Sequence, residues 1–168
     1  MEETSEDIAR LEALLTRSIE QAGPFLRSSF EMPAHSLSAR QLISYLQGVH
    51  TVALATVTAR SEPRVAPIGT IFYRGRFYIP TVADAARTKH VERRPAVSLT
   101  HFVDDGMAII VHGEAAIVRQ DDPEFAQVEV IQRASRGTSV REWGEGVYLR
   151  VDAHVIYTYA RDLASYLA

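Results

Sequence analysis

Residues 76–99 read RFYIPTVADAARTKHVERRPAVSL, and this stretch decides the fold. The runs 77–79 and 96–100 are β-prone, so each predicts a strand. Between them the sequence predicts a short helix with Asp84 as its N-cap. Pro95 ends this helix, because proline lacks an N–H and pushes the preceding residue out of the helical region.

The predicted helix is basic, and its N-terminus follows a strand. Such a helix end presents free N–H groups and a positive dipole to an anion. Arg87 and Thr88 lie four and three positions before Val91, so these residues share the inward face of the helix. Lys89 and Arg93 point away from that face. Two interpretations stay open: a solvated connector between two strands, and a cradle for a phosphate group.

Length and composition describe an ordinary globular protein. The chain has 168 residues, of which 46% are hydrophobic and 23% charged, which suits a single domain with a sizeable core. The net charge of -3 gives no electrostatic argument for binding nucleic acid or an anionic membrane. No apolar run approaches the roughly 20 residues of a membrane span, and the acidic N-terminus is unlike a signal peptide. We therefore expect a soluble cytoplasmic protein. The sequence contains no cysteine, which excludes disulfides and thiol catalysis.

The N-terminal part of the chain is predicted to be helical. Residues 4–22 carry apolar residues at helical spacing behind a capping-box pattern. Residues 24–37 are predicted to form an irregular linker, and a second capping-box pattern begins a helix at Ser38. The sequence therefore divides into a helical extension with its linker, residues 1–37, and a main domain, residues 38–168.

After this helix the pattern of the chain becomes strand-like. Arg74-Gly75 is predicted to be a hairpin turn between two β-prone runs. Antiparallel sheets of this size close into small barrels, because closure removes their edges. The predicted fold is therefore mainly β with flanking helices, a six-stranded antiparallel barrel. The predicted strands cover residues 50–58, 64–73, 76–80, 96–102, 107–118 and 147–159, and a helix from about residue 123 to about residue 136 precedes the last strand.

Three residues interrupt predicted strands. Pro67 and Gly69 lie inside the second strand, and Gly113 lies inside the fifth. Proline cannot donate a ladder hydrogen bond, and glycine weakens a strand unless something approaches its backbone closely. These positions predict bulges, a free sheet edge, or a ligand or chain segment that lies against the backbone.

The common catalytic motifs are absent from the sequence. There is no Walker motif, no G-x-G-x-x-G and no G-x-S-x-G. The six histidines show no metal-ligand spacing, so we interpret them as packed or surface residues. The Asp-Asp pairs at 104–105 and 121–122 fit a turn and a helix cap. Trp143 in its glycine-rich loop either covers an aromatic ligand or packs locally.

The order of these segments resembles the pyridoxamine 5′-phosphate oxidase-like family, whose members are flavin-binding split β-barrels. The resemblance rests on Arg64-Val-Ala-Pro67, on Thr81 before the basic helix, on the run RRPAVSL at 93–99, and on HGEA at 112–115. It covers about residues 38–118, with a looser match to the end of the chain. It implies a six-stranded split β-barrel.

The resemblance also implies a cofactor site. The phosphate of a flavin would be held by Arg64, Thr81 and Arg87, and the isoalloxazine ring would lie along residues 65–67. The Ser and Arg that commonly precede the basic position of this family are Ala85 and Ala86 here. The complete set of predicted cofactor-binding residues is Arg64, Val65, Ala66, Pro67, Thr81, Arg87, Thr88 and Lys89.

The expected function is that of a flavin-dependent oxidoreductase acting on a small organic substrate. FMN is the expected cofactor and a deazaflavin the alternative, and the resemblance implies a homodimer with the cofactor between the subunits. The end of the chain, residues 157–162, lacks the substrate motif of vitamin B6 oxidases, so we do not expect pyridoxamine phosphate oxidase activity. The other hypotheses are a protein that stores a flavin or haem without turnover, and a barrel that has lost its cofactor.

Overall fold

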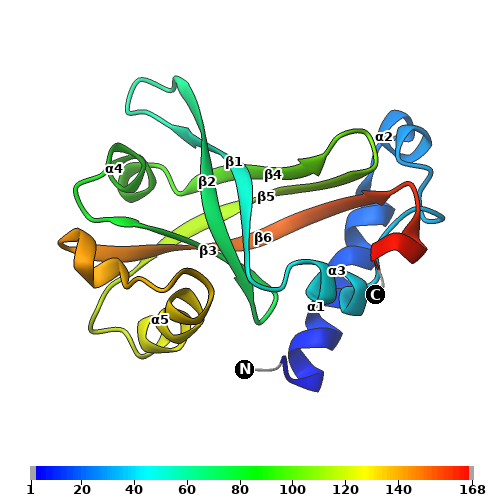
Figure 1. Ribbon diagram of the computed structural model, residues 1–168. Coiled ribbons are helices and arrows are strands. Elements are labelled where there is room, and N and C mark those ends of the chain that lie inside the picture. The colour runs from blue at the N-terminus through cyan, green and yellow to red at the C-terminus, as the bar shows by residue number, and fades with distance from the viewer. Residues whose placement is uncertain (1–2, 167–168) are drawn as a thin grey trace.

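The computed structural model describes residues 3–166, in which six antiparallel strands close a barrel in the order β1-β2-β3-β6-β5-β4 (Figure 1). This confirms the predicted fold class. The strands are β1 (Val49–Val57), β2 (Pro63–Tyr73), β3 (Arg76–Val82), β4 (Ala96–Val103), β5 (Met107–Val118) and β6 (Gly146–Ala160). The helices are α1 (Ser5–Gln21), α2 (Pro24–Ser29), α3 (Ala39–Tyr45), α4 (Ala86–Arg93) and α5 (Pro123–Arg136), with the 3-10 turns η1 (Val140–Trp143) and η2 (Leu163–Tyr166).

Several local predictions are confirmed. Arg74 and Gly75 have φ values of 51° and 73°, as the tight hairpin between β2 and β3 requires. The capping box at Thr4 begins α1, and the one at Ser38 begins α3. α5 ends at Gly137, which adopts the left-handed conformation with a φ of 71°.

Two local predictions are wrong. Residues 24–37 are not wholly irregular, because α2 begins at Pro24 with Gly23 as its N-cap. Proline is favoured at the first position of a helix, where its missing N–H has no partner to lose. The N-cap of α4 is Ala85 rather than Asp84, and it makes no side-chain capping bond. Instead the Thr88 hydroxyl donates to the carbonyl of Val82 at 2.8 Å and fixes the first turn of α4 against the end of β3.

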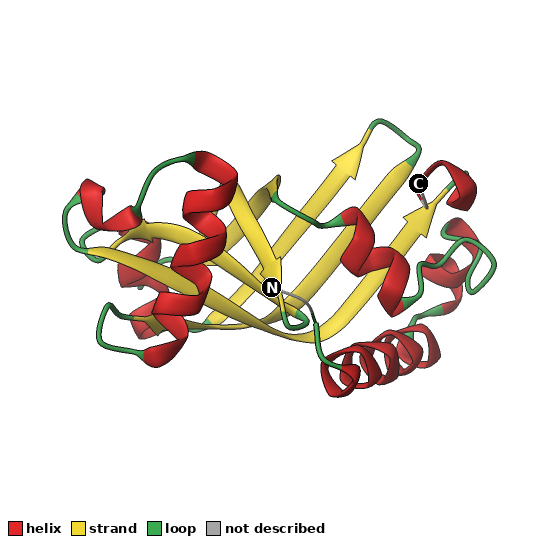
Figure 2. Ribbon diagram, turned by 60° about the horizontal axis from the view of Figure 1, so that its bottom comes forward, coloured by secondary structure: helices red, strands yellow, loops and turns green. Residues whose placement is uncertain are grey.

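The helices gather at two ends of the barrel (Figures 1 and 2). α1, α2 and α3 lie at one end, where buried leucines of α1 and α3 join the barrel interior in one hydrophobic cluster. α4 and α5 lie at the other end. A second buried cluster, which includes Phe125 and Val128 of α5 and Tyr148 of β6, holds α5 against the outer face of the sheet. No helix within residues 3–166 has the length and apolar character needed to cross a membrane.

The sheet is split between β2 and β3. Only residues 71–73 of β2 pair with β3, whereas residues 63–71 pair with β1 on the other side. β3 leaves β2 after Tyr78 and pairs with β6 over residues 77–82. The outer edge of β2 from Pro63 to Thr70 is therefore free of a neighbouring strand in the described chain, so at Pro67 the structure shows the free sheet edge, which was one of the alternatives that the sequence left open.

Gly113 lies at the bulge predicted for β5, where the register against β6 shifts between His112 and Gly113. A Cβ atom at this position would lie well within 3.0 Å of the backbone of Asp152. We expect Gly113→Ala to lower the free energy of unfolding by about 1–3 kcal/mol, because a backbone neighbour cannot rotate away as a side chain can. Chemical denaturation measures this loss. Gly23→Ala is the matched control, since its Cβ would have nothing within 4 Å, and equal stability of the two variants would contradict the prediction.

Candidate functional site

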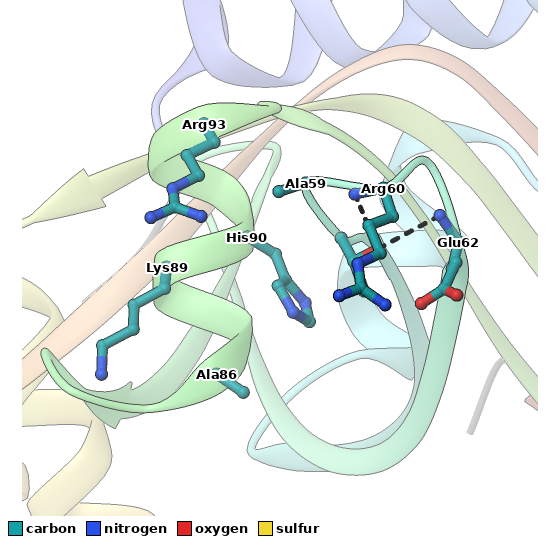
Figure 3. Close-up of a pocket in the computed structure, with 8 residues that line it drawn as sticks. Ala59, Arg60, Glu62, Ala86, Lys89, His90 and Arg93 are labelled. Carbon is teal, nitrogen blue, oxygen red and sulfur yellow. Dashed lines mark hydrogen bonds between the residues drawn. The ribbon is translucent and has the colours of Figure 1, made fainter.

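Within residues 3–166, three cavities that border α4 share lining residues with one another. The turn-side cavity, about 360 Å³, lies between α4 and the β1–β2 turn (Figure 3). The central cavity, about 280 Å³, shares Ala86 and His90 with the turn-side cavity. The α5-side cavity, about 550 Å³, shares Arg87 with the central one. These cavities follow one another along α4 and its N-terminus.

Arg87 joins the two groups of residues predicted for the cofactor site. On the central side it shares a cavity with Arg64, Val65 and Ala66 of β2. On the α5 side it shares a cavity with Thr81 of β3, and its Nη1 donates to the Thr81 hydroxyl at 3.2 Å. Side chains from β2, β3 and α4 thus meet around one half-buried guanidinium.

The remaining residues predicted for the cofactor site do not line the central or the α5-side cavity. Thr88 is fully buried and lines none of the three cavities, because its hydroxyl bonds to Val82. Lys89 is exposed and lines the turn-side cavity. Pro67 is exposed on the free edge of β2 and lines none of the three.

The charges around Arg87 suit an anion. No carboxylate lines the central or the α5-side cavity, and Asp84 is exposed and lines neither. Arg64 donates to a carboxylate oxygen of Glu62 at 2.8 Å, so part of its hydrogen-bonding capacity is already in use. Two guanidiniums without an acid in the same cavity can bind a phosphate or a carboxylate by charged, bidentate hydrogen bonds.

Residues of α5 complete the α5-side cavity, and the sequence prediction missed them. Gln132 lines it and is fully buried, yet neither atom of its amide group has a hydrogen-bond partner. Arg136 packs its guanidinium against Gly69, so a Cβ at that position would require the guanidinium to shift. Gln132 follows Val128 by one turn, so a polar residue at a core position of α5 was the available signal.

Two tyrosine–carboxylate bonds fix α5 to the sheet. Tyr148 of β6 donates to Glu129 at 2.6 Å, and Tyr78 of β3 donates to Glu124 at the same distance. Burial, with the adjacent carboxylate, raises the pKa of both phenols above the usual range, so both remain protonated donors. Gln132 and Arg136 are therefore held on a rigid element.

His90 lies in the wall between the turn-side and central cavities. Its Nδ1 is 2.9 Å from the hydroxyl of Thr56, which is buried on β1.

Residues 3–166 contain no cluster of three or more histidine, aspartate or glutamate side chains suited to a metal ion.

The sequence profile of the pyridoxamine 5′-phosphate oxidase family matches residues 39–157. The chain belongs to this family. The match spans the first five strands and β6 as far as residue 157, and it includes α4 and α5, so the cavities described above are built from residues of the pyridoxamine 5′-phosphate oxidase domain. No curated protein matches the sequence.

Solved structures share this pyridoxamine 5′-phosphate oxidase fold at low sequence identity. A conserved hypothetical protein of Mycobacterium tuberculosis is 18% identical, with a TM-score of 0.67 over 79% of this chain and 91% of that protein. The haem storage protein HutZ of Vibrio cholerae is 18% identical, with a TM-score of 0.59 over 68% of this chain and 88% of that protein. An F420 reductase is 19% identical, with a TM-score of 0.55 over 67% of this chain and 93% of that protein.

Proposed function

We propose that the protein binds a flavin and transfers hydride between it and a small organic substrate. The position of Arg87 carries this proposal, because one guanidinium serves both the central and the α5-side cavity. The flavin phosphate would bind between Arg64 and Arg87, with Thr81 as a further hydroxyl partner. A bound flavin supplies the two-electron chemistry, which explains why the site needs no acid–base pair of its own.

The ring would lie along the free edge of β2, towards α5. Residues 65–67 offer backbone groups there that no neighbouring strand uses. The unpaired amide of Gln132 can donate and accept at once, which matches the alternating N–H and C=O groups of a flavin or deazaflavin pyrimidine edge. The indole of Trp143, 46% exposed, borders the same cavity and gives a flat surface for a ring.

FMN and a deazaflavin are both candidates. The F420 reductase with this fold favours a deazaflavin, and the haem storage protein with this fold favours the second hypothesis, storage without turnover. The absorption spectrum and mass of the material that copurifies with the protein separate these candidates. A flavin spectrum together with steady-state reduction of an added substrate supports the oxidoreductase, whereas a flavin or haem spectrum without turnover supports storage. A colourless protein that binds neither FMN nor a deazaflavin contradicts both the oxidoreductase and the storage hypothesis.

The variant Gln132→Leu tests the ligand role of the buried amide. A buried polar group without a partner destabilises a fold by about 1–3 kcal/mol, so leucine of similar volume should stabilise the unliganded protein. The same change should weaken FMN binding several-fold. Thermal denaturation with and without FMN measures both effects. Lower stability of the unliganded variant would show that Gln132 already has a partner there.

We also propose a homodimer with the cofactor between the subunits. Val65 is 66% exposed at the rim of the central cavity, and a second copy of the chain would cover it. Two-fold contacts between identical surfaces are the commonest form of oligomer. Sedimentation should give twice the mass of the chain at micromolar concentration, and a monomer would count against a site completed by two subunits.

A further inference from the structure

We propose that the turn-side cavity binds a second phosphate, so that the chain accepts a flavin dinucleotide of the FAD type and not only a mononucleotide. This inference rests on the proposed function, because it places the first phosphate between Arg64 and Arg87. It assigns a role to the cationic side chains of α4 that point away from the barrel.

The turn-side cavity carries an excess of positive charge. Arg60, Lys89 and Arg93 line it, and none of the three has a carboxylate partner among the residues that the structure describes. The acid on its lining is Glu62, which is bonded to Arg64 at 2.8 Å. An uncompensated cationic cluster is unexpected in a chain with a net charge of -3, where carboxylates outnumber basic groups.

The cavity walls are fixed before any ligand binds. Figure 3 shows Arg60 reaching from the β1–β2 turn towards His90, with Lys89 and Arg93 one turn apart on α4. The Thr58 hydroxyl accepts the backbone N–H groups of Arg60 and Glu62, each at 3.2 Å, which braces the turn. The Arg94 guanidinium donates to the carbonyl of Ala59 at 3.2 Å and ties the turn to the end of α4. These bonds hold the backbone on both sides of the cavity, so less of the chain has to be ordered when an anion binds.

The turn-side cavity adjoins the proposed site of the first phosphate. Both cavities are lined by Ala86 and His90, and Ala86 presents only a methyl group at this boundary. The α5-side cavity adjoins the central one through Arg87, so the ring and the second phosphate would leave the first phosphate in different directions. FMN ends at its single phosphate, whereas the pyrophosphate of FAD places a second one next to it. The methyl groups of Ala59 and Ala86 and the imidazole of His90 offer apolar surface to the adenosine that follows.

Calorimetric titration of FAD, FMN and AMP into the full chain tests this inference. The wild type should bind FAD at least about tenfold more tightly than FMN, as one additional charged hydrogen bond typically gives. Arg60→Gln, on the exposed turn, should lower the affinity for FAD by about five- to tenfold and that for FMN much less. Lys89→Gln should act in the same direction. Arg40→Gln, on the exposed face of α3, is the matched control and should change neither affinity.

The outcomes separate this inference from the proposed function. If FMN binds but FAD binds no more tightly, or if Arg60→Gln weakens both ligands equally, the second phosphate site is wrong and the flavin proposal stands. If neither FMN nor FAD binds, the proposed function itself is wrong. AMP that competes with FAD but binds together with FMN supports the second site, and AMP that FMN displaces contradicts it.

Discussion

Replacing Arg87 by alanine is expected to weaken FMN binding by roughly ten- to a hundredfold, as losing a charged hydrogen bond of about 1.5–3 kcal/mol does. Among the residues that the structure describes, Arg87 is the one basic side chain that lines both the central and the α5-side cavity. Ala85 and Ala86 bring no side-chain donors to replace it. Arg64 cannot compensate fully, because it is already bonded to Glu62.

Flavin fluorescence during titration of FMN and of a deazaflavin measures this loss. Arg87→Lys should recover part of the affinity, since lysine keeps the charge but cannot bind a phosphate bidentately. Arg40→Gln controls for the removal of one positive charge elsewhere. Equal affinities of the wild type and Arg87→Ala would contradict the phosphate cradle, and α4 would then be a solvated connector between β3 and β4.

Removing residues 1–34 is expected to lower the free energy of unfolding by about 4–8 kcal/mol and to leave a folded β-rich protein. Leu11 and Leu15 of α1 are 2% and 4% exposed in the main hydrophobic cluster, and loss of a buried leucine side chain typically costs about 2–5 kcal/mol. The Ser18 hydroxyl also accepts the backbone N–H of Ile156 at 3.0 Å. The strands that close the barrel all lie within residues 49–160, so barrel closure itself needs none of the deleted residues.

Urea denaturation followed by far-ultraviolet circular dichroism measures the effect of this truncation. Leu15→Ala in the full chain is the matched control and should account for about 2–5 kcal/mol. Because all six strands and the core residues on them remain, the truncated protein should still unfold cooperatively. Loss of any cooperative transition would show that α1 is part of the folding unit of the barrel. Stability equal to that of the full chain would show that α1 contributes no packing energy.

The fold could be predicted from the sequence because its signals are local. The hairpin at Arg74-Gly75 and the proline after α4 act through the conformation of their own residues, and the glycine in β5 interrupts the strand pattern at the bulge. The start of α4 could not be predicted from Asp84, because the bond from Thr88 to Val82 decides where that helix begins. α2 was missed because residues 24–37 were interpreted as an irregular linker, although a proline such as Pro24 also begins helices.

Half of the candidate site was predictable, and half was not. Arg64, Thr81 and Arg87 are implied by the family resemblance, and the structure brings them to adjoining cavities. Gln132 and Arg136 reach the same place from a helix some fifty residues later in the chain. Their placement depends on how α5 docks on β3 and β6, and no periodicity in the sequence contains that information. Gly69 shows the same limit, since the group that approaches its backbone is the guanidinium of Arg136.

The free outer edge of β2 has a consequence for self-association. An uncovered strand edge can add a strand from another molecule and so begin an aggregate. Pro67 lies in the middle of this edge and has no N–H to offer to an incoming chain, and the charged Arg64 lies near its start. The residue that interrupts β2 therefore makes edge-to-edge pairing with another molecule less favourable. We infer that the barrel can keep this edge open for a ligand because proline makes it a poor template for further strands.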